Sequence, residues 1–543
     1  MSGVREAVEA ALSTDPDRTL LFVPGGRRYT RGEIAALSQD WRERAEVTRL
    51  AGGDVVLLEF SREQWPLFVA AYCGCLRSGL VPAIVSAEGG SDRRDAVLEA
   101  LPVRLAVRGK ASQPSGWDDC EFAELLVQGS VPAPGAEYLT TSGTTGRPKL
   151  VAITESVRQR DRERAEGVRA PGVLVLAAPP GTNAAQTALV EALYSHGGGL
   201  ACLDRWSPAA FTDLVEASGA GAALLAPALA ASLVDAPDFA PGRLRSLRVI
   251  RLSMAPADPR LIETIADRLP GARVLNVYTT TEAWPAGTVM SYRSDDVHTV
   301  GRPLPGTRMS VVDERGQAVS PGTRGRVLLA HDARADAAGG PVWVDTGDLG
   351  LLADGGLVLC GRENELVTRG GAMVSFVEVE QAAIATGLVT DAAAWARSGP
   401  ADALAIAVVW RGEPDETALL AVLRERLGPE SVPSVVTAVA ELPRDPQGKL
   451  RRAGLAELAL PAPAAPADGT LAAVLAEIWT EVLMRDSVAD DDDFFALGGD
   501  SLAAVMCNTL VEERLDLVVP LAAHYEAPTF RALLDLLEDR RTT

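Results

Sequence analysis

The sequence predicts a multidomain protein with a large N-terminal α/β domain, a small α+β domain and a C-terminal four-helix bundle. From about Leu20 to Cys360, apolar strand-like runs alternate with helical segments, which is typical of layered α/β folds with largely parallel sheets. A stretch rich in Pro and Ala then interrupts the chain, and helical periodicity dominates after it. The predicted boundaries are 1–361 for the large domain, 362–460 for the small domain, 461–469 for the linker and 470–543 for the bundle.

The elements of the large domain follow from hydrophobic patterning. The segment EQWPLFVAAYCGCLRSG predicts a helix that ends in glycine, between the predicted strands DVVLLEF and LVPAIVS. Further buried strands are predicted at GVLVLAAPP, GAALLAPA, LRVIRLS and ARVLNVY, and a small β unit at RMSVVDE and GRVLLAH.

The smaller domains show shorter patterns. Two predicted helices, VEVEQAAIATG and DETALLAVLRERLG, flank the strand-like run AIAVVWRG, which indicates a compact α+β unit. After the linker LPAPAAPADG, three segments have helical periodicity and, with one more short turn, form a bundle. These segments are TLAAVLAEIWTEVL, SLAAVMCNTLVEERL and TFRALLDLLEDRR.

The charge of the chain excludes some partners. The 543 residues carry a net charge of −21, so nucleic acid is not an expected partner. From Asp468 onward there are 16 acidic and 5 basic residues, which indicates a separate acidic module. No apolar run is long enough to cross a membrane, and the N-terminus lacks an apolar signal core, so a cytoplasmic protein without membrane contact is expected. The six scattered cysteines are expected to be buried thiols.

The loop between Tyr138 and Leu150 is suited to hold an anion. Its glycines allow several backbone N–H groups to point into one concavity, while hydroxyls and a lysine add donors and positive charge. It lacks the spacing of a Walker A loop. The predicted phosphate-binding residues are Thr141, Ser142, Gly143, Thr144, Thr145, Gly146 and Lys149.

The spelling TSGTTGRPK in this loop resembles the phosphate loop of the adenylate-forming (ANL) superfamily, including the adenylation domains of nonribosomal peptide synthetases. Motifs similar to the other family elements follow in the family order and span most of the chain: YTTTE at 278–282, VDTGD at 344–348, GREN at 361–364 and DPQGKL at 445–450.

The resemblance implies a role for each motif. Tyr278 would stack on adenine, Thr281 would contact the nucleotide and act in catalysis, and Glu282 would bind Mg²⁺. Asp348 would accept hydrogen bonds from the ribose, and Arg362 would reach the nucleotide. Asn364 stands where the family has its hinge Asp or Lys. Lys449 would stabilise the charge that develops when two anions react.

A second motif lies near the C-terminus. The acidic run Asp490–Asp493, two phenylalanines and GGDSL resemble a peptidyl or acyl carrier protein. The resemblance implies 4′-phosphopantetheine on Ser501, at the start of a helix, and therefore a phosphopantetheinyl transferase as a partner. A helix N-cap is the structural alternative for this serine.

The substrate pocket is predicted from the family alignment. Amino-acid-activating relatives place an Asp beside the substrate ammonium, whereas this chain has Asn183 and no acid between Gly172 and Val190. Because an unpaired buried ammonium is costly, an acid without a standard α-amine is favoured: an aryl, aliphatic or unusual amino acid. The remaining predicted pocket residues are mostly apolar: Thr187, Leu224, Ile250, Leu252, Val277, Pro285 and Ala286.

The resemblance implies an enzyme that uses ATP and Mg²⁺ to convert a carboxylic acid to an acyl-adenylate. The acyl group would then be loaded onto the chain's own carrier domain, for a downstream acyl-accepting or tailoring enzyme in a nonribosomal peptide or polyketide-type pathway. Two alternatives stay open: an acyl-coenzyme A ligase with a passive carrier domain, and a non-catalytic scaffold protein, against which the intact Lys449 argues.

Overall fold

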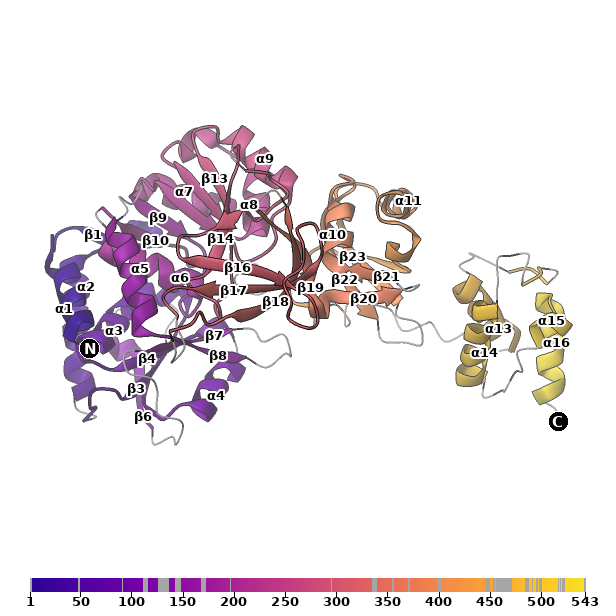
Figure 1. The fold of residues 1–543 in the computed structure, drawn as a ribbon, viewed down its shortest axis with the longest axis horizontal. Helices are drawn as coiled ribbons and strands as arrows, with labels where there is room; N and C mark the ends of the chain where they lie inside the picture. The colour runs from indigo at the N-terminus through magenta and orange to yellow at the C-terminus, as the bar shows by residue number, and fades with distance from the viewer. Residues whose placement is uncertain are drawn as a thin grey trace. The chain divides into compact units, whose positions relative to one another are not determined.

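A computed structural model gives the architecture of the chain (Figure 1). The chain forms two compact units, the first comprising Met1–Trp395, Val408–Val432 and Ala438–Arg452, and the second Ala396–Ala407, Pro433–Thr437 and Ala453–Thr543. The structure describes residues 2–46, 49–89, 91–110, 116–125, 136–141, 148–167, 172–195, 197–293, 295–334, 339–353, 356–369, 372–397, 403–444, 450–452, 455, 471–483, 488–490, 492–494, 497, 501–515, 517, 519 and 523–541.

A six-stranded sheet, β6-β5-β3-β4-β7-β8, forms one layer of the large domain. Its four central strands run parallel, and an antiparallel strand closes each edge. The central strand β3 is buried along its whole length because helices cover both faces of the sheet. The strands are β3 (Val55–Phe60), β4 (Val81–Ser86), β5 (Val103–Gly109), β6 (Cys120–Glu124), β7 (Glu137–Thr141) and β8 (Lys149–Ile153).

A nine-stranded sheet, β15-β14-β13-β12-β11-β9-β10-β1-β2, forms the second layer. Its strands from β13 to β1 are parallel neighbours, so their carboxyl ends meet at one edge. The strands are β1 (Thr19–Phe22), β2 (Arg28–Thr30), β9 (Val173–Leu176), β10 (Gly199–Cys202), β11 (Ala222–Leu225), β12 (Val249–Leu252), β13 (Arg273–Thr279), β14 (Gly287–Ser291) and β15 (Arg302–Pro303).

Helices lie between the two sheets and on their outer faces (Figure 1). The central core joins residues of α1, α2, α3 and α6 to both sheets, and the apolar helix α3 is buried almost throughout. The outer face of the nine-stranded sheet packs on α7, α8 and α9, and that of the six-stranded sheet on α4. The helices are α1 (Ser2–Ser13), α2 (Arg31–Glu46), α3 (Trp65–Arg77), α4 (Ser91–Ala100), α5 (Glu155–Gly167), α6 (Asn183–Tyr194), α7 (Pro208–Ser218), α8 (Pro227–Val234) and α9 (Pro259–Arg268).

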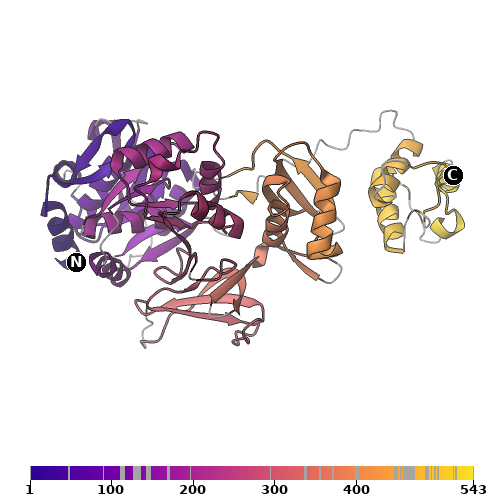
Figure 2. The same ribbon diagram turned by 90° about the horizontal axis from the view of Figure 1, so that it is seen from above.

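The predicted small β unit is a four-stranded antiparallel sheet, β16-β17-β18-β19. Figure 2 shows it as a separate ribbon layer beside the two large sheets. Its core contacts the segment that follows β13, through Ala283 and Ala286. Its strands are β16 (Thr307–Val312), β17 (Gly325–His331), β18 (Val344–Ala353) and β19 (Gly356–Arg362).

The next part of the chain has the predicted α+β character. A short 3-10 helix, η6 (Glu363–Glu365), leads from β19 into a two-stranded sheet of β20 (Leu366–Arg369) and β21 (Ala372–Ser375). Further strands and two helices follow: α10 (Phe376–Ile384), β22 (Val389–Arg397), β23 (Ala403–Trp410), α11 (Glu416–Leu427) and β24 (Val435–Ala438).

Four helices in the second unit surround a separate apolar core, as the periodicity predicts. Trp479 is fully buried there, and its ring makes edge contacts with Phe494 and Phe530 at centroid distances of 5.1 and 5.4 Å. The helices are α13 (Leu471–Leu483), α14 (Ser501–Leu515), α15 (Ala523–Glu526) and α16 (Phe530–Arg541).

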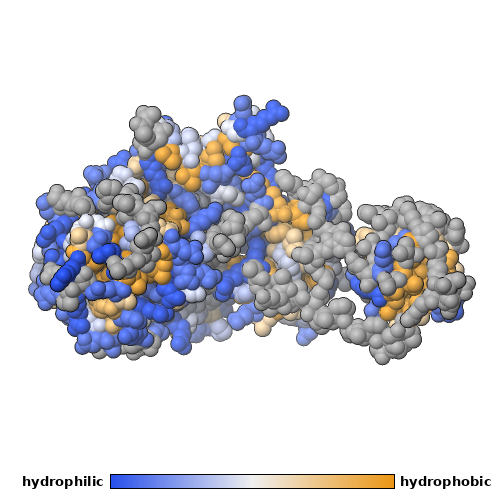
Figure 3. All heavy atoms as spheres, turned by 90° about the horizontal axis from the view of Figure 1, so that it is seen from below, coloured by the Kyte–Doolittle hydropathy of each residue, from blue (hydrophilic) through white to orange (hydrophobic). Residues whose placement is uncertain are grey.

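The cysteines, the surface and the helices of the described residues bear on the expectations from composition. All six cysteines are buried free thiols, as predicted. Figure 3 shows polar residues over most of the visible face of the first unit, with smaller apolar areas between them. Among the helices that the structure describes, none has both the length and the apolar character needed to cross a bilayer.

The bundle core also contains a titratable group. His524 is fully buried, its Nε2 lies 2.8 Å from Oδ1 of Asn508, and its ring packs on Phe494. Its Nδ1 has no partner among the described residues. Burial lowers the pKa of His524 from 6.5 to about 4, so the folded bundle holds this imidazole neutral.

We expect the bundle to lose stability as the pH falls from about 6.5 towards 4, because the unfolded state takes up a proton that the folded state excludes. Hydrogen exchange in α13, α14 and α16 at pH 7 and pH 5, corrected for intrinsic exchange rates, measures this loss. His524→Asn is the control and should remove the pH dependence. Equal protection at both pH values in the unsubstituted protein would contradict the prediction.

Candidate active site

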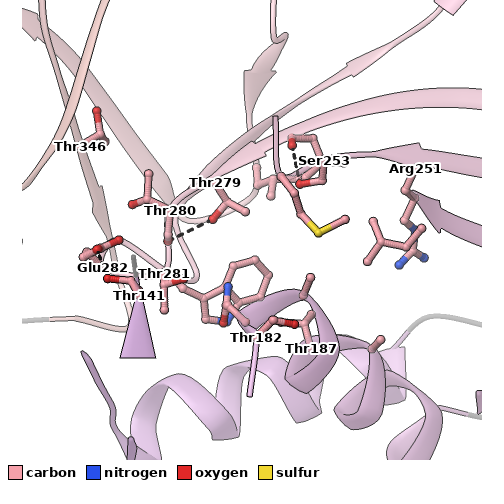
Figure 4. Close-up of a pocket in the computed structure, with 18 of the residues that line it drawn as sticks. Thr141, Thr182, Thr187, Arg251, Ser253, Thr279, Thr280, Thr281, Glu282 and Thr346 are labelled. Atoms are coloured by element: carbon pink, nitrogen blue, oxygen red, sulfur yellow. Dashed lines mark hydrogen bonds between the residues drawn. The ribbon is translucent and has the colours of Figure 1, made fainter. Parts of the chain in front are cut away.

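A cavity of about 670 Å³ opens in the first unit, at the carboxyl ends of the central strands of the nine-stranded sheet. Its walls come from the ends of β7 and β8, the exposed face of α6, strands β11 to β13 and the segment that follows β13. This is the edge where parallel α/β sheets bind ligands, because the connecting loops diverge there. Figure 4 shows the side chains that line it.

One end of the cavity is formed by the strands that flank the predicted phosphate loop. Thr141 ends β7 and Lys149 begins β8, where the two are cross-strand partners, and both line the cavity. The Oγ1 of Thr141 donates a hydrogen bond of 2.9 Å to Oε1 of Glu282. Thr281 lines the same end, and Arg334 Nη1 donates to the backbone oxygen of Glu282 at 2.8 Å. The predicted loop and the YTTTE motif therefore meet, although 141 residues separate Thr141 from Glu282.

A second cluster joins three other predicted residues. Asp348 on β18 is buried and accepts hydrogen bonds from the Tyr278 hydroxyl at 2.6 Å and from Arg362 Nε at 2.9 Å. Burial raises the pKa of Asp348 although Arg362 opposes the shift, and burial followed by the charge of Asp348 raises the pKa of Tyr278 well above 10. Arg362 lines the cavity, whereas Tyr278 and Asp348 are not part of its lining.

Some predicted residues lie outside the described part of the chain: Ser142, Gly143, Thr144, Thr145, Gly146 and Lys449. The hinge residue Asn364 lies in η6, between β19 and β20. Two ion pairs connect η6 to α10, because Arg452 pairs with Glu365 of η6 and with the half-buried Glu380 of α10. Ser501 is the first residue of α14, as predicted.

The structure places four of the eight predicted pocket residues in the lining of the cavity. Asn183, Thr187, Leu224 and Val277 line the cavity. Asn183 is the first residue of α6, whose N-cap Thr182 accepts a hydrogen bond from the Ala185 backbone. The Oδ1 of Asn183 and the Oγ1 of Thr187 are buried and have no partner among the described residues.

Four predicted pocket residues do not line the cavity in the structure. Ile250 and Leu252 pack into the core between the nine-stranded sheet and its outer helices, and Ala286 packs against the four-stranded sheet. Pro285 is buried beside Ala286, outside the lining. On β12 the prediction chose the wrong face of the strand. Neighbouring residues of a strand face opposite sides of the sheet, so Ile250 and Leu252 face the core. Arg251 and Ser253 face the cavity instead.

Sequence reasoning also missed a buried polar network that reaches the wall of the cavity through Asp161 and Trp284. Arg158 of α5 pairs with Glu137 of β7 and, at 2.8 Å, with Asp161. Tyr72 donates to Glu137 at 2.6 Å, and Trp284 Nε1 donates to Asp161 at 2.9 Å. The sequence signal is weak, since α5 reads as a charged surface helix and its apolar content is low.

At the Thr141 end of the cavity, the Glu282 carboxylate is suited to a hard cation. Within the described residues, no group of three or more His, Cys, Asp or Glu residues could hold a metal by itself. Glu282 would supply an oxygen ligand beside the cross-strand pair of Thr141 and Lys149. This arrangement fits Mg²⁺, which proteins bind through one or two carboxylates together with substrate phosphates.

The fold and the site define a ligand-binding α/β enzyme with an appended helical domain, and comparison with known proteins specifies the family. The sequence model of the AMP-binding enzyme family matches residues 8–335, and that of the phosphopantetheine attachment site matches residues 473–537. The chain belongs to the AMP-binding enzyme family and carries a phosphopantetheine attachment domain. The predicted family and the predicted domain combination are confirmed.

Curated relatives include two synthetases that are much longer than this chain. The chain is 28% identical over 98% of its length to malpibaldin synthetase of Mortierella alpina, and 27% identical over 74% of its length to tyrocidine synthase 2 of Brevibacillus parabrevis. It spans only 10% and 12% of these two proteins. It is 30% identical over 67% of its length to sulfoacetate–CoA ligase of Cupriavidus necator, of which it spans 75%.

Solved structures confirm the fold. ATP-bound MatB from Rhodopseudomonas palustris superposes with a TM-score of 0.69 at 21% identity, covering 83% of this chain and 98% of that protein. The o-succinylbenzoate CoA synthetase MenE from Bacillus subtilis superposes with a TM-score of 0.68 at 20% identity, covering 83% and 97%.

The buried ion pairs of Arg158 are expected to contribute to the free energy of unfolding. Arg158→Met should leave two buried carboxylates, Glu137 and Asp161, without their cation, at a cost of about 3–5 kcal/mol in the free energy of unfolding. Urea denaturation of the full chain measures this cost. The matched control Arg243→Met removes an exposed pair with Asp213 and Glu216 and should change the stability far less, because solvent screens exposed ion pairs. Equal effects of the two variants would contradict the prediction.

Proposed function

We propose that this chain activates a carboxylic acid with Mg·ATP and transfers the acyl group to a phosphopantetheine thiol on its own Ser501. The carboxylate oxygen attacks the α-phosphorus and pyrophosphate leaves. The thiol sulfur then attacks the acyl carbonyl and AMP leaves. The observation that carries the proposal is the presence, in one chain, of an AMP-binding enzyme region and a phosphopantetheine attachment domain.

The nucleotide end of the cavity supports the first step. Lys149 and Thr141 bring a cation and a hydroxyl to the two ends of the predicted phosphate loop, and Glu282 is fixed beside them by its hydrogen bond to Thr141. When bound, Mg²⁺ supplies charge neutralisation for the phosphate oxygens. Thr281 and Arg362 line the same space, where donors directed at developing negative charge lower the barrier.

The proposed roles of Tyr278 and Asp348 follow from the hydrogen bond between their side chains. We propose that Arg362 and the Tyr278 hydroxyl hold the Asp348 carboxylate in place for the ribose hydroxyls. The family role of Lys449 as the cation of the small domain is proposed on the resemblance alone. The division into domains at 361, 460 and 469 is proposed on the same basis, with Asn364 in η6 as the hinge.

The second step depends on the carrier domain. A tethered thiol reaches the active site at a high effective concentration, so self-loading is favoured over release of the adenylate. A phosphopantetheinyl transferase is needed to modify Ser501. Because the curated synthetases that the chain resembles are far longer than this chain, we propose that a further enzyme or domain accepts the acyl group.

One relative supports a second candidate. The similarity to sulfoacetate–CoA ligase favours free coenzyme A as an alternative acceptor, with the carrier domain passive.

Ser501→Ala separates the two acceptors. The pantetheinylated protein, incubated with Mg·ATP and a pool of carboxylic acids, should gain the mass of one acyl group, whereas Ser501→Ala should gain none and still exchange pyrophosphate. Thr480→Ala, whose hydroxyl donates to the backbone oxygen of Glu477 in its own helix, is the matched control and should load normally. Acyl-coenzyme A formation by Ser501→Ala at the unsubstituted rate would favour the ligase alternative.

Glu282→Gln tests the metal ligand. We expect pyrophosphate exchange to fall at least about tenfold, equivalent to about 1.4 kcal/mol, and to recover partly at high Mg²⁺ concentration because a neutral amide binds the cation weakly. Glu263→Gln on the outer helix α9 is the control and should keep full exchange. An unchanged Mg²⁺ dependence in Glu282→Gln would exclude the assigned role.

A further inference from the structure

The end of the cavity remote from Glu282 contains an ion pair. Arg251 Nη1 lies 2.7 Å from Oε2 of Glu191, and Arg251 Nη2 lies 2.9 Å from Oε1 of the same carboxylate. Both residues line the cavity, with side-chain exposures of 26% and 18%. Figure 4 shows Thr141 and Glu282 at one end of the cavity, Arg251 at the other and Thr187 between them.

On the strands that flank Arg251, the wall of the cavity is apolar. On the sheet, the cross-strand neighbours of Arg251 are Leu224 on β11 and Leu275 on β13, and both line the cavity. A partly buried ion pair in such a wall contributes little net stability, because desolvation offsets the attraction, and well-packed apolar side chains would serve as well. The position of the pair is therefore better explained by contact with a ligand than by stabilisation of the fold.

A stripe of polar side chains leads to the pair along α6. Asn183, Thr187 and Glu191 are spaced by four residues, so they lie on one face of the helix, and all three line the cavity. From Asn183 to Glu191 the helix rises about 12 Å. The Oδ1 of Asn183 and the Oγ1 of Thr187 lack partners among the residues that the structure describes. Buried polar atoms of this kind are normally satisfied, here by a ligand or water.

The pair offers hydrogen bonds without net charge. The hydrogen bond and charge of Glu191 outweigh the effect of burial and raise the pKa of Arg251, so the guanidinium stays cationic beside the carboxylate. Two of its five N–H donors bond to Glu191, and the donors that remain can reach a ligand. A second carboxylate or an ammonium placed here would add an uncompensated charge, which is costly in a partly buried site. A hydroxyl or a carboxamide at this position would add no charge.

We infer that the cavity selects a carboxylic acid with an uncharged hydrogen-bonding substituent, a hydroxyl or a carboxamide, at the end remote from its carboxylate. Arg251 and Glu191 bind this substituent, and the acid carboxylate points toward Thr141 and Glu282. The inference rests on the proposed function for the orientation of the acid. It replaces the apolar pocket that the sequence predicted with one that has a polar end.

The test is equilibrium binding, by calorimetry, of acids that differ only at the remote end. An aryl series uses 4-methyl-, 4-hydroxy-, 4-carboxy- and 4-(aminomethyl)benzoate, and an aliphatic series uses heptanoate, 6-hydroxyhexanoate, adipate and 6-aminohexanoate. In at least one series the hydroxy acid should bind about tenfold more tightly than its methyl counterpart, as expected for one added hydrogen bond. Equal binding of the two, tighter binding of a charged acid, or no binding of any acid would overturn the inference.

Substitutions of the pair should change the charge preference. Glu191→Gln leaves a net positive charge and should favour the dicarboxylates, whereas Arg251→Met leaves a net negative charge and should favour the amino acids of each series. Arg243→Met, at an exposed pair of the same type on the outer surface, should change nothing. If both pocket variants weaken all the acids alike and keep their order, the pair has only a structural role and the inference is wrong.

Pyrophosphate exchange with the same acids separates this inference from the proposed function. Selective binding of the hydroxy acid without any exchange would support the pocket assignment and contradict acid activation. Exchange that proceeds equally well with methyl and hydroxy acids would support acid activation and overturn the pocket assignment.

Discussion

The ion-pair network around Arg158 is the interaction on which the geometry of the site most depends. It joins Glu137 on β7 of the six-stranded sheet to Asp161 on α5, and Asp161 accepts a hydrogen bond from Trp284, which follows β13 of the nine-stranded sheet. Both sheets are thus connected at the wall of the cavity, which Asp161 and Trp284 line. Since a buried charge without its partner is costly, this network allows few alternative positions for the two sheets.

The position of Trp284 has a consequence for the nucleotide end of the cavity. Glu282 lies two residues before Trp284, and its carboxylate accepts a hydrogen bond from the Thr141 hydroxyl. Thr141 ends β7, the strand that begins with Glu137. The same strand therefore carries a residue of the network at one end and a residue of the site at the other. Because both sheets are fixed to each other at this strand, two distant sequence motifs form one binding surface.

The other end of the cavity is determined by the face of a helix and the alternation of a strand. The polar positions of α6 point into the cavity because its apolar residues, such as Ala185 and Leu189, pack into the central core. On β12 the same rule places Ile250 and Leu252 in the core and leaves Arg251 facing the cavity. The ion pair with Glu191 thus arises from two elements whose facing sides are set by core packing.

The sequence alone determined the architecture and the family. Hydrophobic periodicity is a local property, so the helix at 65–77 and the alternating strands could be predicted from neighbouring residues. Short motifs such as TSGTTGRPK, YTTTE and GGDSL can be read directly from consecutive residues. Their order along the chain indicated an adenylate-forming region followed by a carrier domain, as the family matches confirm.

Tertiary structure decided which side of each element faces the ligand. A shift of one residue on a strand exchanges core and pocket, and nothing local on β12 distinguished Ile250 from Arg251 as a pocket residue. The pairing of Arg251 with Glu191 and of Arg158 with Glu137 joins residues 60 and 21 positions apart. Such contacts depend on how sheets and helices pack, and this packing is fixed by the whole core and not by any one segment.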